Sequence, residues 1–127
     1  MKIEHLAIWT SKLEALTNFY VRYFGAVPGN LYLNPARQFR SKFLSFPDGP
    51  RLELMQGPGI SSDSRGDSRI GLAHFAMSVG SKANVDALTE TLRSAGHAVI
   101  GEPRWTGDGY YESVVLDPEQ NRVEITI

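Results

Sequence analysis

Two histidines and two glutamates carry the most specific chemical signal in this sequence. His5 lies 48 residues before Glu53, and His74 lies 50 residues before Glu124, although the chain has only three histidines. Imidazole and carboxylate groups together suit a divalent first-row metal. A single glutamate on the polar face of a strand is ordinarily just solvated, so it is the repetition of the pair that favours a metal. The sequence therefore predicts a site in which four side chains bind one metal and leave one or two positions for water or substrate.

The two pairs belong to an internal repeat. Residues 4–8 resemble residues 73–77, and the Arg-apolar-Glu-apolar run at 51–54 recurs at 122–125. Each first segment is followed by a Ser-Lys pair and then by a helical stretch that a glycine closes. Landmarks that recur in the same order at nearly constant offset indicate two copies of one structural unit.

We interpret the chain as one domain over residues 1–127, built from two modules. The modules span about 1–56 and 71–127, and the segment 57–70 is rich in Gly, Pro, Ser and Asp, which is typical of a linker. Each module is expected to contain a strand, a helix and three further strands. The expected strands are 2–9, 30–34, 39–46 and 51–56 in the first module, and 71–79, 97–102, 111–117 and 122–127 in the second.

The helices are expected to follow the first strand of each module. Ser11 is a candidate N-cap, Glu14 completes a capping box with it, and Gly25 ends the first helix. The second helix is expected over 82–95, with Gly96 after it. Each helix has one apolar stripe, which packs against only one face of its sheet.

Side-chain alternation along the strands determines what the other face carries. Leu6, Ile8, Leu52 and Leu54 are expected on the helix side in the first module, as are Phe75, Met77, Val79, Val123, Ile125 and Ile127 in the second. The residues expected on the opposite faces are His5, Ala7, Trp9, Arg51, Glu53 and Met55, then Leu72, His74, Ala76, Ser78, Arg122, Glu124 and Thr126. Each module thus presents one histidine and one glutamate on its non-helix face.

Composition excludes several classes of protein. The chain carries 13 Lys and Arg against 14 Asp and Glu, a net charge of -1 that gives no electrostatic case for nucleic acid or an anionic membrane. It contains no cysteine, which excludes disulfides, thiolate nucleophiles and cysteine-bound metals. No apolar run has the roughly 18 residues of a membrane span, and the N-terminus lacks the pattern of a signal peptide. A cytoplasmic location is expected.

The sequence resembles the vicinal oxygen chelate superfamily, which includes glyoxalase I, bleomycin-resistance proteins and extradiol dioxygenases. The resemblance covers nearly the whole chain and is carried by the motifs at 3–8, 18–25, 51–54, 71–76 and 117–124. It implies an α+β fold of two βαβββ modules whose mixed sheets form a cup around the metal. It also implies a small-molecule substrate and a homodimer.

Within that superfamily, the His-Glu-His-Glu pattern resembles bacterial glyoxalase I. The resemblance implies a lyase or isomerase with one Ni, Co, Zn, Mn or Fe ion at His5, Glu53, His74 and Glu124. Glu124 is the expected base, with Glu53 as the group that alternates with it, and the reaction is proton abstraction with stabilisation of an enediolate. The alternatives are a small-molecule binding or resistance protein, an epimerase and a dioxygenase of the same fold.

Substrate contacts are expected from side chains near the ligands. Glyoxalase I proteins that resemble this chain have an arginine for glutathione where this chain has Trp9, and an indole cannot make the bidentate carboxylate contact of a guanidinium. A smaller or more apolar substrate is therefore expected. The candidate contacts are Trp9, Met55, Ser78, Trp105, Tyr110 and Arg40. The aromatic loop at 105–111 either closes over a substrate or is an ordinary turn with Trp105 and Tyr111 in the core, and Arg40 is either a contact for an acidic substrate or a solvated charge.

Overall fold

A computed structural model describes residues 2–61 and 71–127 of the chain. The chain forms two compact units, residues 1–63 and 64–127. Residues 62–70, which make up most of the predicted linker 57–70, lie outside the described residues. None of the helices in the described parts is long and apolar enough to cross a membrane.

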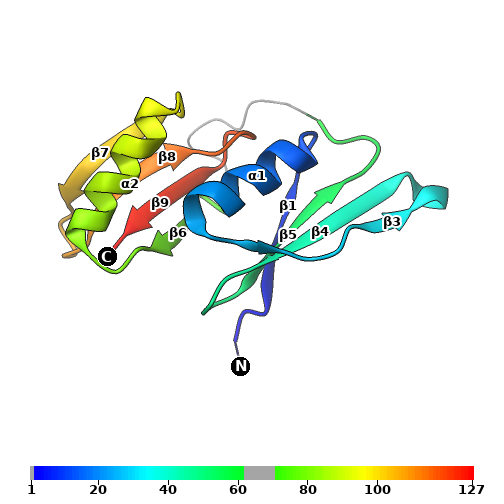
Figure 1. The fold of residues 1–127 in the computed structure, drawn as a ribbon, viewed down its shortest axis with the longest axis horizontal. Helices are drawn as coiled ribbons and strands as arrows, with labels where there is room; N and C mark the ends of the chain where they lie inside the picture. Colours follow the sequence, from blue (N-terminus) through cyan, green and yellow to red (C-terminus); the bar gives the residue numbers. More distant parts are fainter. Residues whose placement is uncertain (1, 62–70) are drawn as a thin grey trace. The chain divides into compact units, whose positions relative to one another are not determined.

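The first unit contains a five-stranded mixed sheet with one long helix against it (Figure 1). Its strands run in the order β1-β5-β4-β2, with β3 also paired to β4, and only β1 and β5 are parallel. The elements in chain order are β1 (His5–Trp9), α1 (Leu13–Phe24), β2 (Val27–Pro28), β3 (Tyr32–Asn34), the 3-10 helix η1 (Pro35–Arg37), β4 (Phe39–Ser45) and β5 (Arg51–Gln56).

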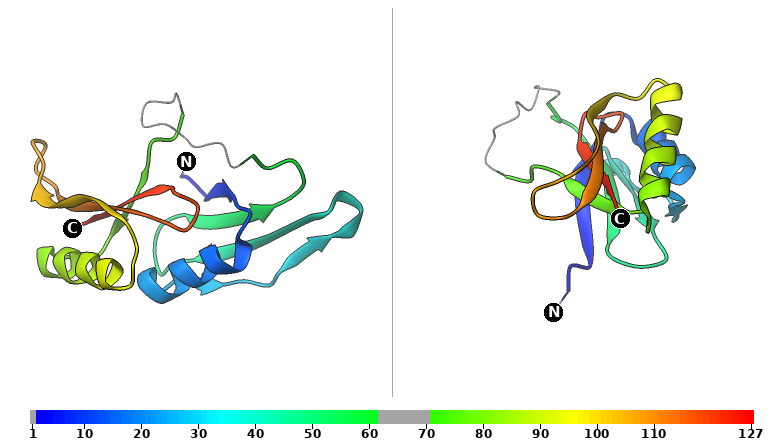
Figure 2. Two further views of the ribbon diagram at one scale, coloured as in Figure 1. Left: turned by 90° about the horizontal axis from the view of Figure 1, so that it is seen from above. Right: turned by 90° about the vertical axis from the view of Figure 1, so that its left-hand side faces the viewer.

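The second unit repeats this plan with four strands, and α2 lies against one face of the sheet (Figure 2). The strands run in the order β6-β9-β8-β7, and again the first and last strands of the unit are parallel. The elements are β6 (Phe75–Ser78), α2 (Lys82–Ser94), β7 (Val99–Trp105), β8 (Tyr111–Leu116) and β9 (Arg122–Thr126). The predicted α+β class with two βαβββ modules is therefore confirmed, and the first module has one short additional strand, β2.

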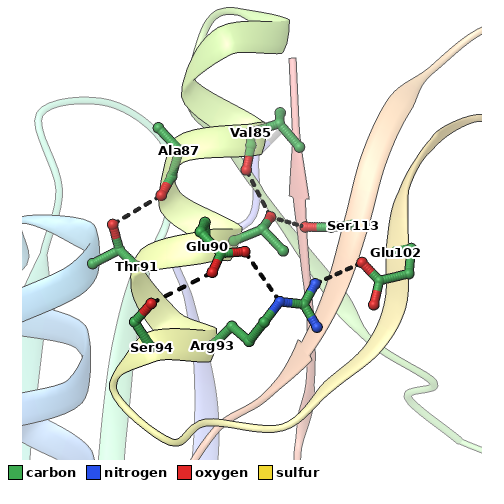
Figure 3. Close-up of polar contacts among 9 residues, drawn as sticks. Val85, Ala87, Glu90, Thr91, Arg93, Ser94, Glu102 and Ser113 are labelled. Atoms are coloured by element: carbon green, nitrogen blue, oxygen red, sulfur yellow. Dashed lines mark hydrogen bonds and ion pairs between the residues drawn. The ribbon is translucent and has the colours of Figure 1, made fainter.

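The helix stripes form the cores that the sequence predicts. In the first unit, Leu16 and Tyr20 of α1 and Leu54 of β5 are completely buried. In the second unit the buried side chains include Val85 and Leu92 of α2. The second core also contains a polar contact, because the hydroxyls of Thr89 and Ser113 lie 2.6 Å apart between α2 and β8 (Figure 3).

Both helices finish before the predicted glycines, but the first helix begins at a different residue from the one predicted. Gly25 and Gly96 follow the helices with φ of 66° and 86°, the left-handed conformation that glycine adopts without strain. Ser11 is not the N-cap: the helix begins at Leu13, and Lys12 occupies the cap position without a side-chain bond. Thr10 accounts for the difference, because its hydroxyl accepts the Lys12 backbone N–H at 2.8 Å.

The face assignments hold for most strand residues and fail at one strand end. Leu52 and Leu54 are buried, while Glu53 between them is only half-buried on the opposite side. Ile127 was expected to face the helix, yet β9 ends at Thr126 and the Ile127 side chain is exposed. Thr126, expected on the opposite face, is buried, and its hydroxyl contacts the Tyr111 carbonyl at 3.4 Å.

Candidate metal centre

The register of the parallel strands brings each histidine close to its glutamate. In the first unit, Ala7 of β1 pairs with Glu53 of β5, so His5 lies two residues before the position opposite the glutamate. In the second unit, Ala76 of β6 pairs with Glu124 of β9 in the same way. Because residues i and i+2 of a strand share a face, each histidine and glutamate project on the same side. The small alanine opposite each glutamate leaves room for the imidazole to approach.

The distances within the two pairs differ. His5 Nε2 lies 3.9 Å from Glu53 Oε2, and His74 Nε2 lies 3.2 Å from Glu124 Oε2. Both glutamate side chains are 18% exposed, whereas the histidines are 40% and 45% exposed. The structure thus brings together His5 with Glu53, and His74 with Glu124, as the sequence predicts within each module. That all four bind one metal remains a prediction.

Each pair has the chemistry and spacing of two neighbouring metal ligands. Metal bonds to imidazole nitrogen and carboxylate oxygen are about 2.1 Å long, which places adjacent ligand atoms about 3 to 3.5 Å apart. The 3.2 Å separation in the second unit lies within that range, and the 3.9 Å separation in the first is slightly longer. The described residues of a single unit do not gather three such side chains. One unit by itself therefore supplies a pair of ligands.

His5 is surrounded by a network that no sequence motif indicated. Its Nδ1 lies 2.5 Å from Glu4 Oε2, and the guanidinium of Arg51 binds the other oxygen of Glu4. Arg51 also lies over the ring of Phe43, 4.1 Å from the centroid, and the edge of the same ring meets the His5 imidazole. The hydrogen bonds from His5, first, and Arg51 lower the pKa of Glu4. This network holds the imidazole from the side that faces away from Glu53.

Glu124 lies in different surroundings. Partial burial, followed by the negative charge of Glu112, raises the pKa of Glu124, while His74 and Arg104 lower it by less. Glu112 itself is only 14% exposed and lies 3.6 Å from the Arg104 guanidinium. Sequence reasoning missed Glu112 and Arg104, although alternation from buried Ser113 places Glu112 on the Glu124 face. A carboxylate with a raised pKa is better matched to accepting a proton near neutral pH.

Three of the substrate candidates share faces with the ligands. Trp9 pairs in register with Met55, and both follow the alternation of His5 and Glu53 along their strands. The Trp9 ring is 49% exposed and meets Phe39 edge-on with the centroids 6.3 Å apart. Ser78 lies on the exposed face of β6 that also carries Ala76.

The aromatic segment at 105–111 is a strand end followed by a tight turn. Trp105 is the last residue of β7 and is exposed, whereas Tyr111 is buried at the start of β8. Thr106 and Tyr110 close the turn, because the Thr106 N–H donates to the Tyr110 carbonyl and the Thr106 hydroxyl accepts from the Tyr110 N–H. The expectation of an ordinary turn with both rings in the core is thus met for Tyr111 and wrong for Trp105. Tyr110, at the base of the turn just before β8, is half exposed.

Arg40 lies on the other face of the first sheet. It pairs with Gln56, whose amide oxygen accepts from Nε and Nη2 of Arg40 at 3.0 and 2.8 Å. Lys42, two residues further along β4, reaches Glu14 of the helix, which identifies this as the helix side. Arg40 lines an open cleft of about 460 Å³ with the apolar walls Leu33, Pro35, Phe39 and Pro58. The structure therefore separates Arg40 from the face that carries His5 and Glu53.

Comparison with protein families gives a match along nearly the whole chain. The model described as "Glyoxalase/Bleomycin resistance protein/Dioxygenase superfamily" matches residues 2–125. A curated protein, the uncharacterized protein YqjT of Bacillus subtilis, is 38% identical over 60 residues. That segment spans 45% of this chain and 47% of the YqjT sequence, about half the length of each.

Solved structures share the fold at low sequence identity. A glyoxylase/bleomycin resistance protein/dioxygenase domain from Frankia superposes with a TM-score of 0.85 at 19% identity, covering 100% of this chain and 97% of that one. The trypanothione-dependent glyoxalase I of Leishmania major gives a TM-score of 0.80 at 20% identity, covering 99% and 86%. A glyoxalase family protein from Enterococcus faecalis gives 0.81 at 23% identity, covering 99% and 97%. At these identities the similarity is one of fold.

Proposed function

The chain belongs to the glyoxalase/bleomycin resistance protein/dioxygenase superfamily, and we propose that within it the protein is a divalent-metal-dependent lyase or isomerase of the glyoxalase I kind. The observation that carries the proposal is the repeated His–Glu pair. Both modules place a histidine and a glutamate on the same face, at the same register of a parallel strand pair, with their nearest nitrogen and oxygen atoms 3.9 and 3.2 Å apart. Ordinary surface residues have no reason to repeat this arrangement in both modules.

The donor set defines the cofactor that fits. His5, Glu53, His74 and Glu124 would hold one Ni, Co, Zn, Mn or Fe ion, because mixed imidazole and carboxylate ligands accept all of these metals. When bound, such an ion supplies Lewis-acid polarisation of two neighbouring substrate oxygens. The partial burial of both glutamates keeps their carboxylates out of bulk water, which strengthens their electrostatic interactions.

Glu124 is proposed as the group that moves the proton. It takes a proton from the substrate carbon next to a carbonyl and returns it to the neighbouring carbon. Its raised pKa supports this role, since a base transfers a proton best when its pKa lies near the working pH. Glu53 is proposed mainly as a metal ligand. It is also proposed as the second carboxylate, which alternates with Glu124 in accepting the substrate proton.

The indole at position 9 favours a substrate that is smaller or more apolar than glutathione. Trp9 offers an exposed indole with Met55 beside it, and neither side chain provides a cationic contact for a carboxylate. We propose Trp9 and Met55 as the wall of the substrate site, with Ser78, Trp105 and Tyr110 as further contacts, in a homodimer that works in the cytoplasm. Arg40 lies on the helix side of β4 and is the weakest of the proposed contacts.

Metal content is the decisive test. The protein is purified without chelating columns and compared with a His5→Ala/His74→Ala double variant by elemental analysis. About one metal per set of four ligands in the wild type, and loss of the metal in the variant, is expected. Activity on hemithioacetals and other vicinal-oxygen compounds is then measured before and after removal of the metal with a chelator. A wild type that binds no metal even after reconstitution would leave a small-molecule binding protein on the same fold.

A further inference from the structure

We infer that Glu4 positions His5, fixing its imidazole in the tautomer that carries the proton on Nδ1 and leaves Nε2 free as a ligand atom. The inference concerns the state of His5 in the protein without metal, and its consequence for metal binding rests on the proposed function. Glu4 is a positioning residue, because it acts on the metal only through His5.

The contacts that support this form a chain from Arg51 to Glu53. Arg51 binds Glu4 Oε1 through two nitrogens, with Nε at 2.8 Å, and its backbone N–H donates to the Glu4 carbonyl at 3.0 Å. The second carboxylate oxygen, Oε2, is thereby directed at His5 Nδ1, 2.5 Å away. Nε2, at the opposite corner of the ring, points toward Glu53.

Two carboxylates face the His5 ring, and only one is within hydrogen-bond distance. Glu4 Oε2 lies 2.5 Å from Nδ1, whereas Glu53 Oε2 lies 3.9 Å from Nε2, too far for a hydrogen bond. An ionised carboxylate only accepts hydrogen bonds, so the Nδ1–H of His5 is the donor to Glu4, and a neutral imidazole then has its lone pair on Nε2. Free histidine prefers the opposite tautomer, with the proton on Nε2. Glu4 therefore selects the form that a metal requires, before a metal is bound.

Phe43 restricts the orientation of the same ring. Its edge-on contact with the imidazole, with centroids 5.4 Å apart, limits rotation of His5 about its side-chain bonds. The Arg51 guanidinium lies over the Phe43 ring and also binds the Glu4 carboxylate, so Arg51 connects these two neighbours of His5. Metal ligands that donate their second ring nitrogen to a carboxylate are held in this way in many metal sites.

The second module provides an internal comparison. His74 occupies the position that corresponds to His5, but the preceding residue is Ala73, so no carboxylate precedes it. The ion-pair contact described for His74 is with Glu124 through Nε2. The tautomer control by a preceding carboxylate therefore belongs to the first module only.

The primary test is a long-range ¹H–¹⁵N spectrum of histidine-labelled, metal-free full-length protein at about pH 8, above the ordinary pKa of imidazole. The His5 signals are expected to show a protonated Nδ1 and an unprotonated Nε2 in the wild type. Glu4→Gln keeps the size of the side chain but adds a donor, and Glu4→Ala removes the contact. Both variants are expected to shift His5 toward the Nε2-protonated form while the His74 signals stay unchanged. Glu14→Ala is the matched control, since it removes a glutamate of the same unit that contacts Lys42 instead.

Metal affinity is the second readout. Titration of the metal-free protein with Co²⁺ is expected to give affinity about 10–100-fold weaker for Glu4→Gln than for the wild type and for Glu14→Ala. Unchanged His5 signals in both Glu4 variants, or a wild-type His5 already protonated on Nε2, would overturn the inference. If the wild type binds no Co²⁺ but the Glu4 variants still shift the His5 tautomer, the positioning role stands and the proposed metal-dependent function fails.

Discussion

The two modules repeat a ligand geometry but surround it differently. In both, an alanine faces the glutamate across a parallel strand pair, and the histidine lies two residues before that alanine. In the first module the Glu4 carboxylate contacts His5 through Nδ1, the ring nitrogen that does not face Glu53, and Arg51 in turn binds Glu4. In the second module the glutamate has the special environment, because burial and the neighbouring Glu112 raise the pKa of Glu124.

The comparison shows that the position of a histidine and glutamate pair and the chemical environment of each side chain have different causes. Backbone register alone is sufficient to bring a histidine and a glutamate together, so both modules achieve that. Which member of the pair is constrained depends on the side chains around it. The first module constrains its imidazole, and the second raises the pKa of its carboxylate. Under the proposed function, the first module would anchor the metal and the second would move the proton.

The largest effect on activity is expected from replacing each of the two ligand glutamates, Glu124 and Glu53, by glutamine in separate variants. Glu124→Gln is expected to lower turnover about 10²–10⁴-fold even at saturating metal, because a glutamine cannot accept the proton. Glu53→Gln is expected to weaken metal binding chiefly, so that added metal restores part of its activity. The measurement is kcat at increasing metal concentration for both variants. Equal losses at saturating metal would remove the division of roles, and full activity of Glu124→Gln would exclude it as the base.

A smaller effect is expected in the packing of the helices, where the modules also differ. The Thr89 hydroxyl donates to the Val85 carbonyl and contacts the Ser113 hydroxyl, and both side chains are buried (Figure 3). Thr89→Val leaves the Ser113 hydroxyl buried without this partner, which is expected to lower the free energy of unfolding by about 1–3 kcal/mol. The double variant Thr89→Val/Ser113→Ala is expected to lose less than the sum of the single variants.

Thr17 is the matched control in the first module. It is buried on α1, and its hydroxyl donates to the Leu13 carbonyl of its own helix at 2.8 Å. Thr17→Val is expected to cost less free energy of unfolding than Thr89→Val because, among the described residues, the hydrogen bond of the Thr17 hydroxyl stays within its own helix. Urea unfolding measures all four variants. A Thr17→Val loss as large as that of Thr89→Val would show that the cross-layer contact contributes little.

The smallest effect concerns an exposed charge cluster on the second module. Hydrogen bonds from Lys82 and Tyr111 lower the pKa of Asp86, and the contact with Asp86 raises the pKa of Lys82. The Asp86 contribution is present above its unfolded pKa and is lost as pH falls through the lowered folded value. The Lys82 contribution is present below its unfolded pKa and is lost as pH rises through the raised folded value. Asp86→Asn is therefore expected to destabilise slightly at pH 7 and hardly at all near pH 2, as followed by urea unfolding, and a constant difference across pH would exclude the ionic contribution.

Local periodicity predicted both long helices and most of the strands, and it placed each histidine on the same face as its glutamate, but it did not predict β2 and it placed β7 at 97–102 rather than Val99–Trp105. Strict alternation in Arg51–Gln56 fixed the face of Glu53, and the repeat transferred the same assignment to Glu124. The sequence alone does not place Arg40 on a face, because β4 has Phe43 and Leu44 side by side and so does not show which face is apolar. The register that pairs Lys42 with Leu54, together with the contact of Lys42 with Glu14, identifies the helix side.

Three other features differ from the sequence pattern or are not visible in it, each for its own reason. Ser11 and Glu14 have the spacing of a capping box, yet Thr10 takes the Lys12 N–H and the helix begins at Leu13. The role of Glu4 is invisible in the sequence because it depends on Arg51, 47 residues away, and on one rotamer of the carboxylate. The two-residue strand β2 is too short to have a periodicity of its own.

In each module the first strand pairs with the last, so each histidine and its glutamate come together only after the whole module has been synthesised. A histidine at the start of a module meets its glutamate only after the intervening helix and strands have been synthesised and the final strand has docked between β1 and β4, or between β6 and β8. The first pair is complete once β5 has left the ribosome, while the second must wait for β9. Since domains fold as the chain emerges, the nascent protein passes through a stage that has one finished ligand pair and one lone histidine. Under the proposed function, the four metal ligands would therefore all be in place only after β9 has been synthesised and has paired with β6.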